Sequence, residues 1–205
     1  MARSQRDDDR MMRWLLIALI VFGAWQWWGS RGIEHAPGVI AAVAPEQRVI
    51  TASPPQFQKK GYTLTALARF TLTARVLGVE HYHFDREADL APVDFALGWG
   101  PMSDSAVLSK LKISQGGRFY HWRTDEFPIP RREIEVNSAN MHLIPATPAV
   151  EKQLKRARTG SIVQLSGFLV EVRAGDGWRW VSSLTREDTG AGACELIWVE
   201  EFDVR

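Results

Sequence analysis

A run of fifteen uncharged residues lies close to the N-terminus, at residues 14–28 (WLLIALIVFGAWQWW), and arginines flank it on both sides. A bilayer accepts such a segment, and indole rings prefer the headgroup level, where Trp25, Trp27 and Trp28 would stand. As a helix the run would be about 22 Å long at 1.5 Å per residue, so neighbouring residues would have to extend it across a hydrocarbon core of about 30 Å. We therefore expect a single transmembrane helix at residues 14–30.

The charges around this segment predict its orientation. Four arginines precede it within the first 13 residues, and the cytoplasmic flank of a membrane helix carries the excess of positive charge. Because no small-x-small cleavage motif follows closely, an uncleaved signal-anchor is favoured over a signal peptide. We expect a single-pass protein of the bacterial inner membrane, with a cytoplasmic tail (residues 1–13), a Pro- and Ala-rich extended tether (residues 31–60) and a periplasmic domain (residues 61–205).

The sequence of residues 61–205 predicts a β-rich domain. Residues 68–77 (ARFTLTARVL) alternate apolar and polar side chains, as a half-buried strand does. Strand-like segments at residues 112–114 and 118–123 flank Gln115-Gly116-Gly117, which predicts a hairpin with its turn at these three residues. Pro148 opens a short helix. Between residues 161 and 173 the apolar side chains are at odd-numbered positions before Ser166-Gly167 and at even-numbered positions after it. Only one of the two sets can face the core of a regular strand, which predicts a bulge or sharp bend at Ser166-Gly167. The expected fold is α+β: the N-terminal transmembrane helix, then a small antiparallel β-barrel or OB-like domain with one or two short helices.

Five strings spread over about residues 60 to 200 carry a resemblance: YTLTALARF, ALGWGPMSD, ISQGGRFYHWR, NSANMHLIPA and SSLTREDTGAGACELIWV. They resemble a family of uncharacterised single-pass bacterial membrane proteins of similar length. The resemblance implies the same single-pass layout, and it implies no activity, cofactor or ligand.

Histidines are the first candidates for chemistry. His81 and His83 occupy alternate positions of a predicted strand, so both would project from one face, as pairs of metal ligands do. His121 and His142 lie on other predicted strands and, with a carboxylate such as Asp85, could complete a tetrahedral set. The spacing matches no metal motif, so solvent-facing histidines are the simpler interpretation. A metal-dependent hydrolase that uses His81 and His83 is kept as an alternative function.

Two further motifs match catalytic patterns but have simpler interpretations. Residues 188–191 spell DTGA, as in aspartic proteases, but polar residues precede it where that family has an apolar strand. A turn capped by Asp188 is therefore the simpler interpretation. Cys194 could be a nucleophile with His121 or His142 as its base, but no nearby cation favours the thiolate, and a buried structural thiol is simpler.

Tryptophans are dense in the C-terminal part. Stacking on aromatic rings is how OB-like barrels hold sugars or single-stranded bases, so a glycan or nucleic-acid binding module is a second alternative, although tryptophans also fill cores.

The charges beyond the N-terminal segment are balanced. Of the 25 Lys and Arg and 24 Asp and Glu, four Arg and three Asp lie in the first 13 residues, which leaves 21 of each sign beyond them. This neutral balance gives no support to a nucleic-acid partner.

The polar, glycine-rich stretch at residues 183–194 lies between two predicted strands, in the kind of loop where binding functions concentrate. The candidate binding residues are Arg186, Glu187 and Asp188 in this stretch, with Trp178 and Trp180 before it. The sequence predicts no catalytic residue, no metal and no cofactor. We expect a membrane-anchored, non-enzymatic envelope domain that binds or helps assemble another membrane or periplasmic protein.

Overall fold

The computed structural model describes residues 12, 14, 16, 17, 31–185 and 194–205. The chain divides into two compact units, Met1–Gly32 and Ile33–Arg205. The second unit contains every strand described below.

The expectation of an N-terminal transmembrane helix is corrected. Among the residues that the structure describes, no helix is long and apolar enough to cross a membrane. Of the expected span at residues 14–30, Trp14, Leu16 and Ile17 are described as helical and exposed, and the other residues lie outside the described part of the chain. The physical reason is length, because fifteen uncharged residues give a helix of about 22 Å against a hydrocarbon core of about 30 Å.

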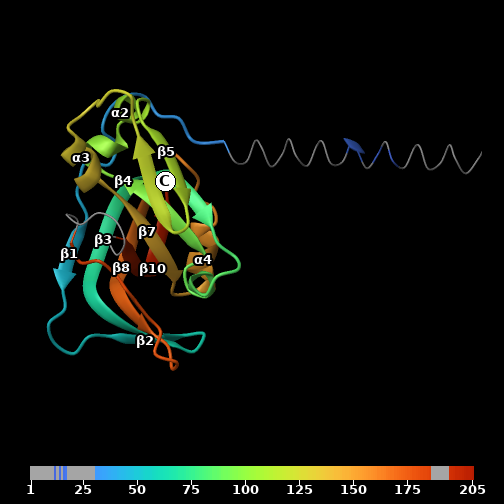
Figure 1. Cartoon of the computed structure of the whole chain (residues 1–205), viewed down its shortest axis with the longest axis vertical. Coiled ribbons are helices and arrows are strands. Elements are labelled where there is room, and N and C mark those ends of the chain that lie inside the picture. Colours follow the sequence, from blue (N-terminus) through green and yellow to red (C-terminus); the bar gives the residue numbers. More distant parts are fainter. Residues whose placement is uncertain (1–11, 13, 15, 18–30, 186–193) are drawn as a thin grey trace, which may run out of the picture. The chain divides into compact units, whose positions relative to one another are not determined.

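Five strands close into a barrel (Figure 1). They pair in the order β3, β4, β7, β10, β8 and back to β3, and every pair is antiparallel except β7–β10, which is parallel. This is the Greek-key order of an OB barrel, so the β-rich part of the expectation is consistent with the structure. The strands are β3 (Tyr62–His81), β4 (Val93–Gly98), β7 (Ser138–Pro145), β8 (Ile162–Arg173) and β10 (Glu195–Val204).

Shorter elements surround the barrel. β1 (Glu46–Val49) and β2 (Gln56–Lys59) pair with β3, and β9 (Arg179–Val181) pairs with β8. β5 (Lys112–Gly116) and β6 (Phe119–Arg123) form a separate hairpin. The remaining elements are the helices η1 (Glu87–Asp89), η2 (Gly100–Ser103), α2 (Ser105–Leu108), α3 (Arg131–Val136) and α4 (Pro148–Leu154).

The alternation of the sequence explains the barrel interior. β3 buries every second side chain from Tyr62 to Val76, and Phe70, Phe95 and Leu143 from three strands meet in one buried apolar cluster. Helix α4 begins at Pro148, as predicted, and it contributes Val150 and Leu154 to the same cluster. The core is therefore formed by strands that alternate buried and less buried side chains, with one short amphipathic helix packed against them.

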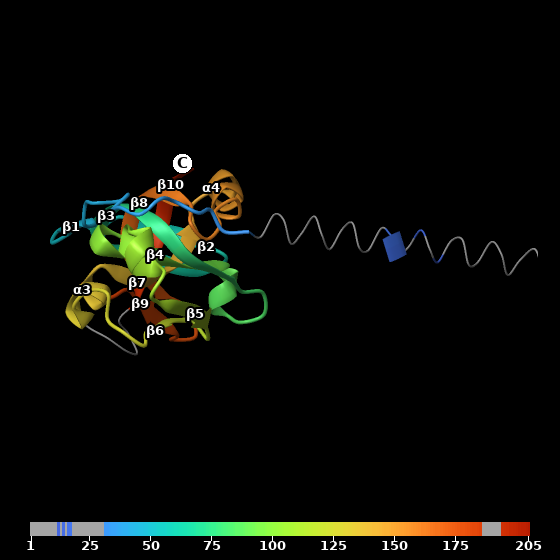
Figure 2. The same cartoon turned by 90° about the horizontal axis from the view of Figure 1, so that it is seen from above.

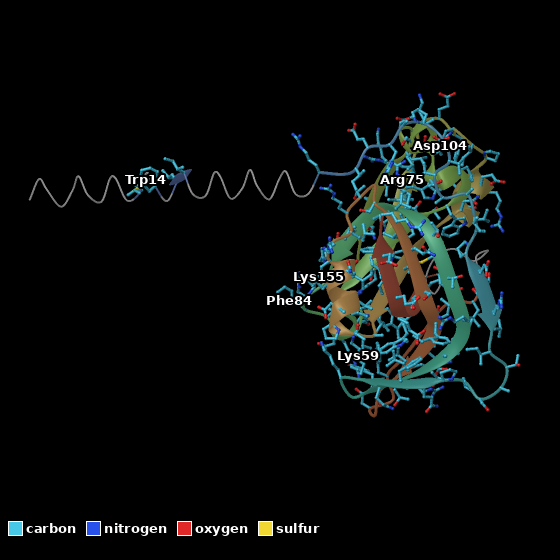
Figure 3. The ribbon with its side chains drawn as sticks, turned by 180° about the vertical axis from the view of Figure 1, so that it is seen from behind. Trp14, Lys59, Arg75, Phe84, Asp104 and Lys155 are labelled. Atoms are coloured by element: carbon cyan, nitrogen blue, oxygen red, sulfur yellow. The ribbon has the colours of Figure 1, made fainter. Side chains whose placement is uncertain are left out.

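The segment expected to be a tether is packed against this domain. The backbone N–H groups of Ile40 and Ala41 donate to Ser103 Oγ at 3.1 and 3.0 Å, and Gly38 N donates to Asp104 Oδ1 at 2.8 Å. The buried Arg75 donates to the carbonyl of Ser103 at 3.1 Å, and Figure 3 shows Arg75 and Asp104 at the same end of the domain. Residues 33–60 thus belong to the folded unit.

The prediction of a bulge or sharp bend of β8 at Ser166-Gly167 is wrong. β8 pairs continuously with β3 through both residues, whereas the extra residue falls on β10, between Val199 and Glu201, opposite them. A Cβ on Gly167 would lie 1.9 Å from the carbonyl oxygen of Trp198. Glycine is required here because the backbones of β8 and β10 approach too closely for a side chain.

This close approach predicts a stability effect. Gly167→Ala should lower the free energy of unfolding by about 2 kcal/mol or more, because strand backbone has to move to admit the methyl group. Denaturant unfolding measures the change. Gly116→Ala is the matched control, since nothing lies within 4 Å of a Cβ built at Gly116. Equal unfolding free energies for the two variants would show that the close contact is not needed.

Candidate functional site

The hairpin β5–β6 covers the outer face of two barrel strands. Ile113, Tyr120 and Trp122 of the hairpin pack in one apolar cluster with Ala96 of β4, and Tyr120 Oη lies 3.0 Å from Ser138 Oγ of β7. Figure 2 shows β5 and β6 beside β7 and β9. The second and third strands of an OB barrel usually present this face to ligands, so here the chain covers that face itself.

The predicted hairpin is present and turns through two residues. Gly117 and Arg118 have φ angles of 57° and 69°, and they separate the paired residues Gly116 and Phe119. Positive φ at both central positions defines a type I′ turn. For Arg118 this conformation costs about 1 kcal/mol, so its contacts have to offset the strain.

Arg118 joins the hairpin turn to the loop that follows β3. One guanidinium nitrogen donates to Asp94 Oδ1 at 3.0 Å and to the carbonyl of Ala91 at 2.9 Å, and another donates to Asp85 Oδ1 at 2.7 Å. The guanidinium carbon lies 3.8 Å from the centre of the Tyr82 ring, and the Arg118 N–H donates to Tyr82 Oη at 3.0 Å. The side chain is only 14% exposed. One residue therefore fixes two loops to each other.

The Tyr82 hydroxyl suits this role chemically. Burial raises its pKa, and the hydrogen bond from the Arg118 amide opposes the rise only in part. The phenol is therefore neutral over the physiological range, where its oxygen accepts the Arg118 N–H.

Asp94 is the buried counter-charge of Arg118. Its side chain is fully buried, and Asn140 Nδ2 donates to its Oδ2 at 3.4 Å. Gln115 Nε2 of the hairpin in turn donates to Asn140 Oδ1 at 2.8 Å. His142 Nδ1 lies 2.8 Å from Asp94 Oδ2, but this contact lacks the alignment of a hydrogen bond. The guanidinium is accordingly the main compensation for the carboxylate charge.

The two predicted binding tryptophans lie beside this network. The ring centre of Trp180 is 4.9 Å from that of His142 and 6.1 Å from that of Trp178. Arg86 stacks on Trp178 at 4.6 Å, and it also forms a 2.9 Å ion pair with Asp176. Both tryptophans are half-buried, so much of their ring surface is already in contact with the chain.

The other predicted site residues are dispersed or undescribed. Arg186, Glu187 and Asp188 lie outside the described residues. Cys194 Sγ lies 3.8 Å from the carbonyl oxygen of Arg118, at the edge of the network.

The structure gives no support to the metal alternative. His83 lies beside Phe84 and His121 beside Phe119, while His142 belongs to the buried network. Within residues 31–185 and 194–205, no three His, Cys, Asp or Glu side chains are placed to hold a metal ion. Burial, with a smaller contribution from His83, lowers the pKa of His81.

An exposed aromatic surface lies next to the network, and sequence reasoning missed it. The Phe84 side chain is fully exposed, and Phe119 is 40% exposed. Phe84 immediately precedes Asp85, and Phe119 immediately follows Arg118, so the 2.7 Å ion pair between those two charged residues brings the loops together. Figure 3 shows Phe84 projecting away from the ribbon. We call residues 82–86 and 117–119 the Phe84 surface.

No family model, no curated protein and no solved structure matches this chain.

Removal of Arg118 should leave Asp94 buried without its counter-charge. We expect Arg118→Ala to lower the free energy of unfolding by about 3 kcal/mol, as measured in denaturant. In an Asp94→Asn background the same change should cost only about 1 kcal/mol, because no buried charge is left behind. Equal costs in both backgrounds would mean that the pair does not carry the stability.

A pH dependence follows from Tyr120. Burial raises its pKa to about 12, above the unfolded value of about 10. Because the folded state favours the protonated phenol, this stability is fully present below pH of about 10 and is lost as the pH rises towards 12, by up to about 2 kcal/mol. Unfolding measured between pH 8 and pH 11 should decline less in Tyr120→Phe than in the wild type. Parallel declines would refute the assignment.

Proposed function

We propose that this domain is a non-enzymatic protein-binding module and that the Phe84 surface is its binding surface. The observation that carries the proposal is a fully exposed Phe84 side chain on a loop tied to the barrel by the 2.7 Å Arg118–Asp85 ion pair. Burial of an exposed phenylalanine releases about 1.5 to 3 kcal/mol. Among the residues that the structure describes, none covers the Phe84 side chain, so a partner could supply this gain.

The composition of the surface supports a protein partner. Aromatic residues are enriched in the centres of protein interfaces, and a few of them supply most of the binding energy. Phe84 and Phe119 are two exposed aromatic side chains on the two loops that the Arg118–Asp85 ion pair joins. The rings of His83 and His121 lie beside them, at 6.1 and 6.4 Å.

Two observations favour a protein over a glycan or a nucleic acid. The hairpin β5–β6 covers the barrel face that OB domains use for oligomeric ligands, and its apolar side chains pack in one cluster with Ala96 of β4. Beyond the first 13 residues the chain carries 21 basic and 21 acidic side chains, whereas binding of a phosphate backbone is driven by excess positive charge.

Photo-crosslinking tests the proposal. A benzophenone analogue of phenylalanine at position 84 of the full chain, expressed in its native host, should give one discrete adduct with another protein. Phe127 is the matched control position, because it is also an exposed phenylalanine, at 52%, and it follows the opposite end of the hairpin. The same adduct pattern from both positions would contradict a binding surface at Phe84.

A substitution gives a second, independent readout. Phe84→Asp should reduce recovery of the crosslinked partner by about tenfold or more, because an interface anchor is worth about 1.4 kcal/mol or more. It should change the free energy of unfolding by less than about 0.5 kcal/mol, because the side chain is exposed. Pull-down and denaturant unfolding measure the two effects. Full recovery of the partner by Phe84→Asp would argue against the proposal.

A further inference from the structure

We propose that Arg118 is a positioning residue, which holds Phe84 ready for a folded partner that offers a preformed apolar pocket. This inference rests on the proposed function and adds to it how the surface works. Arg118 would act by fixing the backbone on both sides of Phe84, and the Phe84 side chain would make the main contact with the partner.

The contacts of Arg118 bracket Phe84 along the chain. On one side, the guanidinium stacks on the Tyr82 ring at 3.8 Å, and the Arg118 N–H donates to the Tyr82 hydroxyl at 3.0 Å. On the other side, the guanidinium binds Asp85 Oδ1 at 2.7 Å, and this same oxygen accepts the N–H of Ala88 at 2.5 Å. Only His83 and Phe84 lie between the two attachment points. The path of the backbone through Phe84 is thereby fixed.

Arg118 is itself held by the barrel. One guanidinium nitrogen forms a 3.0 Å ion pair with Oδ1 of Asp94, a fully buried residue of β4. Asn140 of β7 donates to the Arg118 carbonyl oxygen at 3.1 Å. Arg118 thus connects the ordered strands β4 and β7 to the exposed loop at residues 82–86.

Stability alone does not account for this arrangement. Well-packed apolar side chains often stabilise a protein interior as much as a buried ion pair does. An ion pair with fixed hydrogen-bond geometry instead selects one conformation, and here that conformation presents Phe84 to solvent. A prearranged anchor avoids the entropic cost of ordering the loop on binding, which suits a partner whose pocket already exists.

The test acts on the loop attachment rather than on the buried charge, because Arg118→Ala would also disturb the fold. Asp85→Asn removes the charge that ties the loop and leaves the Arg118–Asp94 pair in place. The matched control is Asp125→Asn, because Asp125 forms a 3.5 Å ion pair with Lys112 at the opposite end of the same hairpin. Asp85→Glu is the conservative variant that retains the carboxylate.

The readout needs no ligand. In the full chain, 4-fluorophenylalanine at position 84 reports the motion of the ring by fluorine NMR, and amide exchange reports the motion of residues 82–86. We expect Asp85→Asn to narrow the fluorine line and to speed amide exchange there by about tenfold, with an unchanged melting temperature. The control should match the wild type, and Asp85→Glu should restore the wild-type line. An unchanged line and unchanged exchange in Asp85→Asn would overturn the positioning role.

Binding separates this inference from the proposed function. If position 84 crosslinks a partner, Asp85→Asn should lower the yield of that same adduct about tenfold, because the binding-competent loop conformation would be populated correspondingly less. A mobile loop with an undiminished adduct yield would overturn the positioning role and leave the binding surface standing. A wild-type chain without any adduct would remove the proposed function, and with it the positioning role in binding, whatever the fluorine line shows.

Discussion

The buried charge of Asp94 is the constraint on which the outer layer of this domain depends. A carboxylate with no exposure to water needs compensation from within the chain, since an unpaired buried charge is strongly destabilising. Arg118 supplies it from a hairpin that belongs to a different sheet. This pairing ties the hairpin turn, with the positive φ of Arg118, and the loop at residues 82–86 to β4, in addition to the apolar packing of the hairpin.

The sequence predicts the parts of the fold that depend on local pattern. Alternation in residues 68–77 marked β3, Pro148 marked the start of α4, and Gly116-Gly117 marked the hairpin. It did not predict the parallel pairing of β7 with β10, because that contact joins strands more than fifty residues apart. The apolar run at residues 14–28 led to an expected membrane span, although its length was already short of a bilayer.

The candidate site was less predictable for a related reason. Asp94 stands in the sequence VDFALG, where a polar residue between apolar ones normally indicates the solvent side of a strand. The Asp94 side chain does face away from the barrel interior, but the hairpin covers that face of the strand. The residues of β4 alone do not indicate that β5 and β6 will pack on it. Trp178 and Trp180 remain predicted binding residues, and the sequence did not predict their contacts with Arg86 and His142, because those contacts depend on tertiary structure.

A covered barrel face changes what an OB scaffold can offer a partner. With β4 and β7 beneath the hairpin, the accessible features at this end are loops, and loops are usually the least ordered part of a domain. The network of Arg118 joins the loop at residues 82–86 and the hairpin turn to β4, a strand that is buried on both faces. In the proposed role, this attachment would hold the backbone at Phe84 before a partner binds and so lower the entropic cost of a specific protein contact.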